Sequence, residues 1–342
     1  MIDLLVAGCG PAGAATAIRA ALAGLSVVVL EPRPGPIDKA CGEGIAHSAV
    51  NYLDRLGVEL TGRPFHGIRY LDADHSVDAR FTTGPGLGVR RTALHQALLD
   101  RFAELNVPIV PTRVGPITQN TTSVTAAGHT ARYLAAADGL HSPIRRQLGL
   151  SGERTAQSGA PARRGLRQHF QVSPWTDLVE VYWSPLGEAY VTPVADDLVG
   201  VAVLTTARGT FDSHLDAFPT LKRRLSSATP ANTVMGAGPL HQRVHQRVSG
   251  RVLLVGDAAG YIDALTGEGI AVALRTSAEL VDCVIADRPA DYESAWRRVS
   301  RECRLLTASL LWARNRRLLA PHIVPAAARL PGIYGHIVNR LS

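Results

Sequence analysis

Near its start, the chain has residues whose types and spacing are those of a dinucleotide site: Gly8, Gly10, Gly13 and Glu31. The three glycines suit a tight turn, a close approach of backbone to a pyrophosphate, and close packing of a helix on a sheet. The pyrophosphate would lie at the N-terminus of that helix, where free N–H groups and the helix dipole favour an anion. An acid at the position of Glu31 accepts from a ribose 2′-hydroxyl, which favours FAD or NAD over NADP.

The elements that must position these residues form a βαβ unit. Residues 3–7 are an apolar strand, residues 14–23 are alanine-rich and helix-prone, and residues 26–30 are a β-branched strand. Because strand, helix and terminal acid accompany the glycines, a dinucleotide site is favoured over an ordinary glycine turn. The predicted site also includes the following residues of the turn and the loop after the acid: Pro11, Ala12 and Arg33.

Further along the chain, two more glycine motifs follow apolar strands. Asp138 and Gly139 follow the strand at 133–137, and Asp257 follows the strand at 251–255. Open α/β sheets bind ligands at such strand ends. A second glycine pair, Gly267 and Gly269, then opens a helix expected over 270–285, and Ile270 is its first residue.

The loop before a helix expected from His47 carries Cys41 and Gly42. Glycines on both sides of Glu43 indicate either backbone brought near a ligand or a plain loop. Cys41 either lies at the cofactor or is a small buried residue, and its neighbours favour the cofactor. The histidines have no triad or metal-ligand spacing, so we expect surface or structural roles for them: His47, His95, His141 and His169.

The middle of the chain has a strand period. Residues 67–71 and 77–81 predict a hairpin, and residues 164–204 predict an antiparallel sheet with one face on a pocket and the other on solvent. Trp183 and Tyr190 are the expected pocket residues of this sheet. Single helices are expected over 211–225 and over 292–319.

Composition bounds the class of protein. The chain has 342 residues, 46% of them hydrophobic and 19% charged, so it can bury a sizeable core in two domains or one two-lobed domain. The net charge is +7, yet no zinc-finger spacing or aromatic-studded basic stretch indicates nucleic-acid binding. The four cysteines show no CxxC pair or metal spacing, and no apolar run reaches the ~18 residues of a membrane span. We therefore expect a cytoplasmic protein with reduced thiols and no metal.

The ordered set of three strand-end glycine motifs resembles the FAD-dependent aromatic hydroxylase superfamily, with the fold of p-hydroxybenzoate hydroxylase, over roughly residues 6–285. The resemblance implies an α/β protein in which a Rossmann-like FAD-binding domain is interrupted by a substrate domain with a mainly antiparallel sheet. The expected bounds are 1–62, 89–150 and 248–290 for the FAD-binding domain, 63–88 and 151–247 for the substrate domain, and 291–342 for a C-terminal helical segment.

The same resemblance implies roles for the motif residues. Gly8, Gly10, Gly13 and Glu31 would hold the ADP part of FAD. Arg91 is similar to the arginine that reaches the flavin's polar chain, and Asp257 to the aspartate at the ribityl chain. Asp138 and Gly139 are similar to the family's element that contacts FAD and transient NADH or NADPH. The helix opened by Gly267, Gly269 and Ile270 would point at the N1–O2 edge of the flavin.

Two features leave the reaction open. Ala264 stands where many hydroxylases have proline, and residues 39–44 with 266–270 are similar to the geranylgeranyl reductase branch. Our first hypothesis is an FAD-dependent, NAD(P)H-using monooxygenase that inserts oxygen into an apolar or aromatic small molecule. The second is an FAD-dependent C=C reductase, and the third is a non-catalytic flavin-binding module. Halogenase chemistry is disfavoured, because residues 183–186 do not match the halogenase Trp-x-Trp-x-Ile-Pro motif. No catalytic acid or base is identified from the sequence.

The basic C-terminal helices admit two interpretations. A solvated face is the common one. The alternative is a cover over the substrate entrance, or peripheral contact with a membrane that delivers an apolar substrate.

Overall fold

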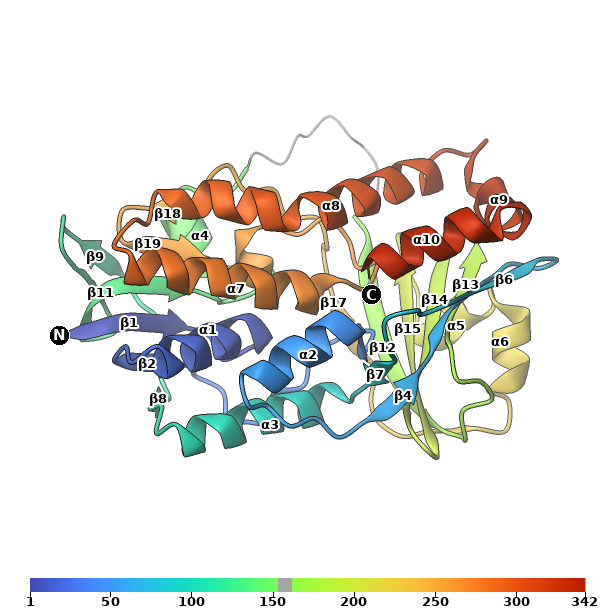
Figure 1. Cartoon of the computed structure of the whole chain (residues 1–342). Coiled ribbons are helices and arrows are strands. Elements are labelled where there is room, and N and C mark those ends of the chain that lie inside the picture. The colour runs from blue at the N-terminus through green and yellow to red at the C-terminus, as the bar shows by residue number, and fades with distance from the viewer. Residues whose placement is uncertain (153–161, 342) are drawn as a thin grey trace.

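The computed structural model describes residues 1–152 and 162–341, and Figure 1 shows two large sheets side by side with a long helix, α8, running along both. The expected substrate segment 151–247 includes residues 153–161, which lie outside the described residues. The fold is α/β, with a parallel sheet, antiparallel sheets and C-terminal helices, as the sequence predicts.

The first sheet has the strand order β18-β19-β11-β1-β2-β8, and its central strands run parallel. Residues 4–7 of β1 are fully buried, which explains why this strand is a continuous apolar run. Small side chains on α1, such as Ala14 and Ala17, allow the helix to pack close to this sheet, between α3 and α7. The elements are β1 (Ile2–Ala7), α1 (Pro11–Leu22), β2 (Val27–Leu30), α3 (Arg91–Glu104), β8 (Ile109–Val110), β9 (Ile117–Gln119), β10 (Val124–Ala126), β11 (His129–Ala136), α4 (Pro143–Gln147), β18 (Val248–Ser249), β19 (Val252–Leu254) and α7 (Gly269–Ile285).

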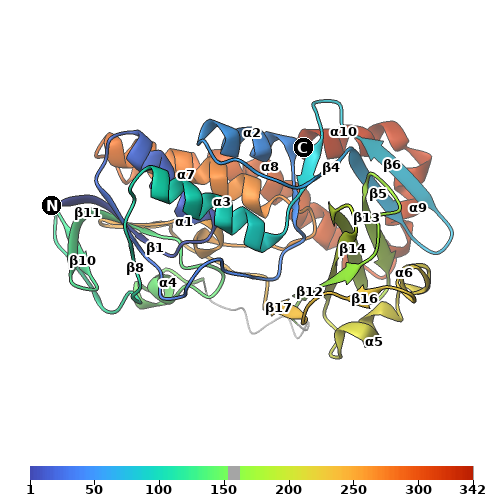
Figure 2. The ribbon, with the colours of Figure 1, turned by 90° about the horizontal axis from the view of Figure 1, so that it is seen from below.

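The second sheet has the order β16-β12-β15-β14-β13-β5-β6 and is antiparallel except where β13 pairs with β5. Figure 2 shows α5 and α6 on the outer side of this sheet. The predicted hairpin is confirmed as β5 and β6. The elements are β5 (Gly67–Leu71), β6 (Ser76–Arg80), β12 (Arg164–Gln171), β13 (Val179–Ser184), β14 (Gly187–Ala195), β15 (Leu198–Thr205), α5 (Phe211–Leu215), α6 (Pro219–Arg224), β16 (Thr229–Pro230) and β17 (Met235–Ala237).

Two expectations about this region were wrong. The face of the sheet opposite the pocket is not solvated, because α5 and α6 cover it and bury Glu180 and Tyr182. The expected helix over 211–225 is two short helices, since Pro219 begins α6, and a proline is favoured in a first turn but breaks a helix interior.

The C-terminal segment comprises α8 (Asp291–Arg314), η2 (Ala320–His322), α9 (Ile323–Arg329) and α10 (Pro331–Leu341). The helix α8 therefore ends five residues before the expected end at residue 319. Arg340 of α10 forms an ion pair of 2.5 Å with Glu302 of α8. Over the part of the chain that the structure describes, no helix combines the length and the apolar character needed to cross a bilayer.

A small third sheet joins the two halves of the chain. It contains β3 (Gly44–Ile45), β7 (Gly86–Gly88) and β4 (Arg63–Phe65), and α2 (His47–Arg55) follows its first strand. The backbone of this sheet lies directly against β14, because a Cβ on Gly88 would come within 1.8 Å of the Pro193 carbonyl oxygen. The loop that carries Cys41 is thereby held close to the second large sheet.

Candidate functional site

A cavity of about 1080 Å³ extends from the strand ends of the parallel sheet to the C-terminal helices. This volume is at the top of the roughly 300–1,000 Å³ range of ordinary ligand pockets. The cavity brings together most of the residues predicted from the sequence: Gly8, Gly10, Pro11, Ala12, Glu31, Arg33, Cys41, Gly42, Arg91, Asp138, Gly139, Tyr190, Asp257, Gly267, Gly269 and Ile270.

The first glycine turn has the geometry that its three glycines predict. Gly8 has a φ of +101°, and a Cβ there would lie 2.6 Å from the Ala137 carbonyl oxygen. A Cβ on Gly13 would lie 2.0 Å from the Gly8 carbonyl oxygen, so Gly13 serves the packing of α1 and does not line the cavity. Gly10 lines the cavity directly before α1, whose first-turn N–H groups are available to an anion.

Glu31 is buried at the end of β2 and is held by two partners. Its Oε2 accepts from the Cys9 backbone N–H at 3.0 Å, and its Oε1 accepts from Arg33 Nε at 2.8 Å. Burial alone would raise the pKa of Glu31, but the Arg33 guanidinium and the Cys9 N–H lower it overall, so the carboxylate is ionised. Arg33 is half exposed, so a ribose hydroxyl at Glu31 would share this carboxylate with a side chain that has room to move.

His95, expected to be surface or structural, is buried behind this turn. Its Nε2 lies 2.9 Å from the Cys9 carbonyl oxygen, and its Nδ1 accepts from the Ile37 N–H at 3.3 Å. These partners assign the proton to Nε2. Burial lowers the pKa of His95, so the neutral ring fixes the glycine turn and the loop at residue 37 together.

Two buried polar atoms in the cavity wall are suited to a polar ligand. Within the described chain, Asp138 Oδ1 and Arg91 Nε have no hydrogen-bond partner, although both side chains line the cavity. The other carboxylate oxygen of Asp138 accepts from the Ile144 N–H, and Ser142 caps α4. Because an unpaired buried polar atom costs free energy, these two atoms fit the hydroxyl and phosphate groups of a dinucleotide.

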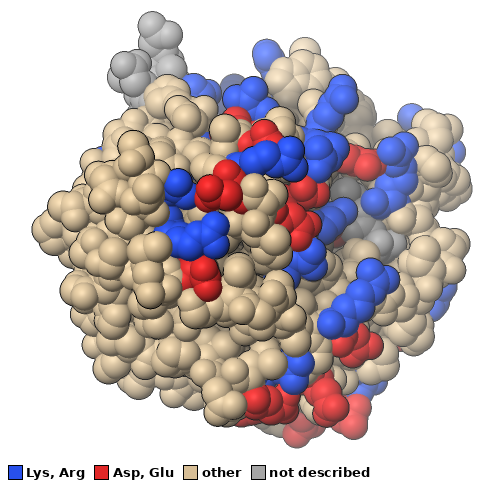
Figure 3. All heavy atoms as spheres, turned by 60° about the vertical axis from the view of Figure 1, so that its left-hand side comes forward, with Lys and Arg blue, Asp and Glu red and all other residues tan. Residues whose placement is uncertain are grey.

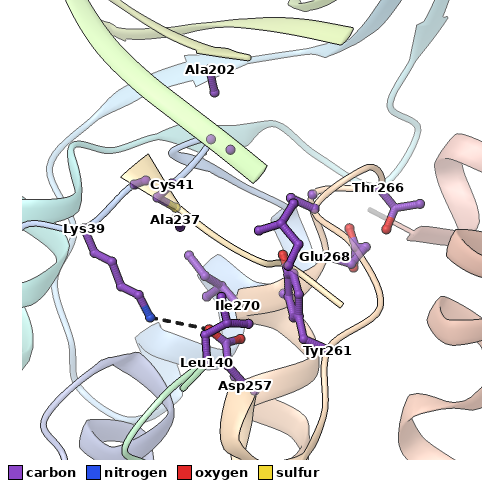
Figure 4. Close-up of a pocket in the computed structure, with 18 of the residues that line it drawn as sticks. Lys39, Cys41, Leu140, Ala202, Ala237, Asp257, Tyr261, Thr266, Glu268 and Ile270 are labelled. Carbon is purple, nitrogen blue, oxygen red and sulfur yellow. Dashed lines mark ion pairs between the residues drawn. The ribbon is translucent and has the colours of Figure 1, made fainter. Parts of the chain in front are cut away.

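The third motif lies beside the second in the cavity wall, because Arg145 donates to the carbonyl oxygens of both Leu140 and Asp257. Figure 4 shows Lys39 reaching across the cavity toward Asp257, to which it forms an ion pair of 3.5 Å. The chain then passes through Gly267, with a φ of +73°, into the start of α7 at Gly269, which lines the cavity beside Ile270. The positive end of this 17-residue helix therefore faces the cavity, where it favours a negative charge.

Glu268 lies between these two glycines and is a titratable group that the sequence did not single out. Its side chain is 6% exposed, and Arg275 NH2 is 3.6 Å from its Oε2. Burial raises the pKa of Glu268 to about 7, while Arg275 opposes this shift. Glu268 is thus poised to exchange a proton near neutral pH.

A buried polar network under the Cys41 loop was missed from the sequence. Glu43 Oε2 lies 2.5 Å from His169 Nε2, and Arg167 Nη1 lies 3.0 Å from His169 Nδ1. Glu43 Oε1 accepts from the Arg91 N–H at 2.8 Å, so Glu43 caps the N-terminus of α3. Arg167 also pairs with Asp38, whose neighbour Lys39 lines the cavity.

This network holds Glu43 in a left-handed backbone conformation, with a φ of +61°. Such a conformation is rare outside glycine and persists where the surroundings enforce it. Another strand of the same sheet, β14, adds a bond, because Thr192 Oγ1 donates to the Gly42 carbonyl oxygen at 2.7 Å. The loop that presents Cys41 to the cavity is therefore fixed by β12 and β14.

Cys41 and Tyr190 present protonated groups to the cavity. Burial raises the pKa of the Cys41 thiol, and its sulfur accepts from the Glu43 N–H at 3.4 Å. Burial also raises the pKa of Tyr190, whose hydroxyl donates to the Leu265 carbonyl oxygen at 2.7 Å. Trp183 was expected to line the pocket, and this expectation was wrong. The residue is not among the described residues that line the cavity, because its ring packs behind Tyr70, with the two ring centroids 5.2 Å apart.

Beyond these groups the cavity becomes apolar. Its wall there is formed by the second large sheet and the C-terminal helices. Figure 4 shows Ala202 of β15 on the side of the cavity opposite Asp257. The apolar lining residues include Ile68, Tyr70, Phe81, Val179, Val181, Leu306, Leu310, Ala327, Leu330, Ile333 and Val338. Over residues 1–152 and 162–341, no cluster of three or more metal-ligand side chains is present.

Known proteins match the chain at the level of family, sequence and fold. A family model described as an FAD binding domain matches residues 1–184. A menaquinone reductase of Mycobacterium tuberculosis is 30% identical over 313 residues, which cover 82% of this chain and 76% of that protein. Digeranylgeranylglycerophospholipid reductase 2 of Methanosphaera stadtmanae is 26% identical over 303 residues, which cover 80% of this chain and 75% of that protein.

Solved structures share the fold at low sequence identity. The flavin-dependent brominase Bmp2 has a TM-score of 0.80 at 18% identity, and the match covers 99% of this chain and 93% of the brominase. A flavoprotein/dehydrogenase from Cytophaga hutchinsonii has a TM-score of 0.79 at 18% identity, with 91% and 85% of the two chains covered.

Proposed function

The chain belongs to the FAD-binding domain family, and from this premise we propose that it is an FAD-dependent reductase that saturates a C=C bond in the polyprenyl chain of a lipid-like substrate. The observation that carries the proposal is the lining of the cavity, which passes from the predicted cofactor residues to an apolar part formed by the second large sheet and the C-terminal helices. We call this part the apolar arm. An elongated apolar ligand fits such an arm, and its reacting bond would lie beside the start of α7.

The relatives favour reduction over the first hypothesis, oxygen insertion. Those at 30% and 26% identity are named for reduction of menaquinone and of a digeranylgeranylglycerophospholipid. Both compounds carry polyprenyl chains, although their polar ends differ. The likeness to halogenases rests on the fold, at 18% identity for the brominase.

The polar wall would hold the cofactor. Arg91, Asp138 and the turn at Gly10 would bind its polar chain, and Asp257 would accept from its hydroxyl groups. FAD, when bound, would accept a hydride from NADH or NADPH that binds transiently and would pass it to one carbon of the substrate double bond. The dipole at the start of α7 would stabilise the negative charge that reduction brings to this end of the cavity.

Saturation of a double bond also requires a proton at the second carbon. Cys41 is the group that we assign to this step, because burial keeps its thiol protonated and the rigid loop presents it to the cavity. Tyr190 is less suited, since its hydroxyl is already committed to the Leu265 carbonyl oxygen. The apolar arm excludes water from the reacting carbon.

The test is to reduce the FAD-loaded protein without oxygen and to mix it with an unsaturated polyprenyl quinone or polyprenyl lipid. We expect flavin reoxidation that depends on the substrate, and a product heavier by two hydrogen atoms. Uptake of labelled dioxygen into a product would instead establish the monooxygenase. A bound flavin that no reduced nicotinamide bleaches would favour the non-catalytic module.

A further inference from the structure

Large apolar side chains are exposed on the C-terminal helices, where a packed protein normally places polar residues. We call this set the apolar rim. Leu318 is 85% exposed, and Ile333 and Trp312 are 57% and 56% exposed. The rim consists of Leu305, Trp312, Leu318, Leu319, Leu330, Ile333 and Ile337. Exposed apolar side chains that gather on neighbouring elements mark an interaction site.

Three residues of the rim lie at an opening of the cavity. Leu330, Ile333 and Ile337 both line the cavity and are exposed, so the cavity reaches the surface beside α10. The facing wall is α8, where Leu306 and Leu310 line the cavity. Figure 1 shows α8 and α10 side by side, and the Arg340–Glu302 ion pair joins them at one end. An apolar chain could therefore enter between these two helices.

The part of the chain that follows Glu302 carries the whole rim and contains basic but no acidic side chains. Arg316, Arg317 and Arg329 are exposed there, while Arg340 is exposed and pairs with Glu302. Figure 3 shows another face of the molecule, where basic and acidic side chains lie next to each other. Arginine side chains around an apolar patch match the headgroup region of an anionic bilayer.

The surface is preformed, because the buried sides of the helices are tied to the sheet. Tyr334 packs on Tyr70 and donates to the Ile68 carbonyl oxygen at 3.2 Å. Asn339 accepts from the Thr82 N–H at 2.7 Å, and Arg314 Nε donates to Glu188 at 2.6 Å. The rim side chains are thus the part of these helices that remains for a partner.

We propose that the apolar rim docks on an anionic lipid bilayer and that the opening between α8 and α10 receives the apolar chain of a substrate directly from that bilayer. The docking stands on the rim itself, whereas the entry of a substrate rests on the proposed function. A second copy of the chain fits less well, because a two-fold contact would place these arginines against one another.

The experiment is flotation of the FAD-loaded protein with phosphatidylcholine vesicles that contain or lack phosphatidylglycerol. We expect at least tenfold tighter binding to the anionic vesicles, and weaker binding as salt is added. The double variant Leu318→Ser/Ile333→Ser should bind at least tenfold less than the wild type. A matched control, Leu22→Ser/Ile285→Ser, removes one exposed leucine and one exposed isoleucine of α1 and α7 and should bind as the wild type does.

Trp312 supplies a second readout. Brominated lipids should quench its fluorescence when vesicles are added, and this quenching should disappear in Trp312→Phe. Circular dichroism and flavin content show whether each variant is folded. Equal vesicle binding by the rim variant and the control would overturn the proposal, as would absence of vesicle binding by the wild type or a dimer whose formation buries Trp312.

The outcomes separate docking from the reaction. Reduction of a detergent-solubilised polyprenyl substrate without vesicle binding would overturn the docking surface and leave the proposed function standing. Vesicle binding by a protein that reduces no such substrate would overturn the proposed function and the entry of substrate, and would leave docking standing.

Discussion

At the scale of single residues, the glycine turns and the acids at strand ends were predictable, because their signals are local. Gly8 and Gly13 have the close backbone contacts that the motif requires, and Ser142 caps α4. No local pattern in the sequence predicted the buried network of Glu43, His169 and Arg167, since Glu43 and His169 lie 126 positions apart. The fold alone brings them together, although the glycines flanking Glu43 did indicate an unusual loop.

Asp257→Ala should lose FAD during purification. The side chain lines the cavity at the start of the third motif, and removing it deletes an acceptor for the cofactor's hydroxyl groups. The measurement is the ratio of flavin to protein absorbance after gel filtration. Asp74→Ala, in the exposed turn of the β5–β6 hairpin, is the control and should keep its flavin. Stoichiometric flavin in Asp257→Ala would show that this aspartate does not bind the cofactor.

Glu43→Ala should lower the free energy of unfolding by about 3 kcal/mol, because it leaves His169 buried without its carboxylate partner and leaves Arg167 with Asp38 as its carboxylate partner. It also removes the cap on the Arg91 N–H. Glu43→Gln keeps a hydrogen-bond acceptor and should lose only about 1 kcal/mol. Urea unfolding followed by circular dichroism measures both. Equal losses in the two variants would contradict this prediction, because they would show that the acceptor kept in Glu43→Gln stabilises nothing.

Glu268 predicts a pH dependence of stability. Burial raises its pKa in the folded protein to about 7 from an ordinary value of 4.5, so folding favours the protonated form. Its stabilising contribution is full below pH 4.5 and is lost as the pH rises through 7. Glu268→Gln should therefore be more stable than the wild type at pH 8, by up to about 3 kcal/mol, and similar to it at pH 4.5. Thermal unfolding at the two pH values tests this, and a gain of equal size at both would contradict it.

At the scale of elements, hydrophobic period predicted most strands and helices, while their partners came from the fold. The alternation in β13 put Trp183 on the pocket face, but β5 pairs beside β13 and its Tyr70 covers the indole. Tyr190, on the next strand, stays in the cavity wall. Pro219 could have predicted that residues 211–225 form two helices instead of one. The burial of the outer face of the sheet could not be predicted in this way, because it depends on where α5 and α6 pack against the sheet.

Arg314→Ala should loosen the C-terminal end of α8. Arg314 Nε donates to Glu188, which is fully buried and keeps Arg163 as a second partner, so we expect a loss of about 2 kcal/mol of stability. Limited proteolysis should then cut the segment after α8 faster than in the wild type. The exposed Arg317→Ala is the control. Unchanged cleavage in Arg314→Ala would show that other contacts hold this end.

At the scale of the whole molecule, the cavity lies between the two large sheets, so a ligand that fills it contacts both. FAD at 100 times its dissociation constant should add about 2.7 kcal/mol to the stability of the folded chain. We expect both sheets to unfold in one transition, with circular dichroism and flavin release changing at the same temperature. Two separated transitions would show that the sheets unfold independently and that the cofactor stabilises one of them.

The long helix α8 has a mechanical consequence. Its 24 residues span about 36 Å. Near one end, the Tyr292 hydroxyl donates to the Leu254 carbonyl oxygen of the parallel sheet, and at the other end Arg314 binds Glu188 of the second sheet. The helix α8 therefore holds the two large sheets at a fixed distance. Moving the sheets apart would require breaking the buried hydrogen bond at one end of the helix. Ligand exchange then uses the opening beside α10, and the fixed length of α8 limits how wide a ligand the cavity admits.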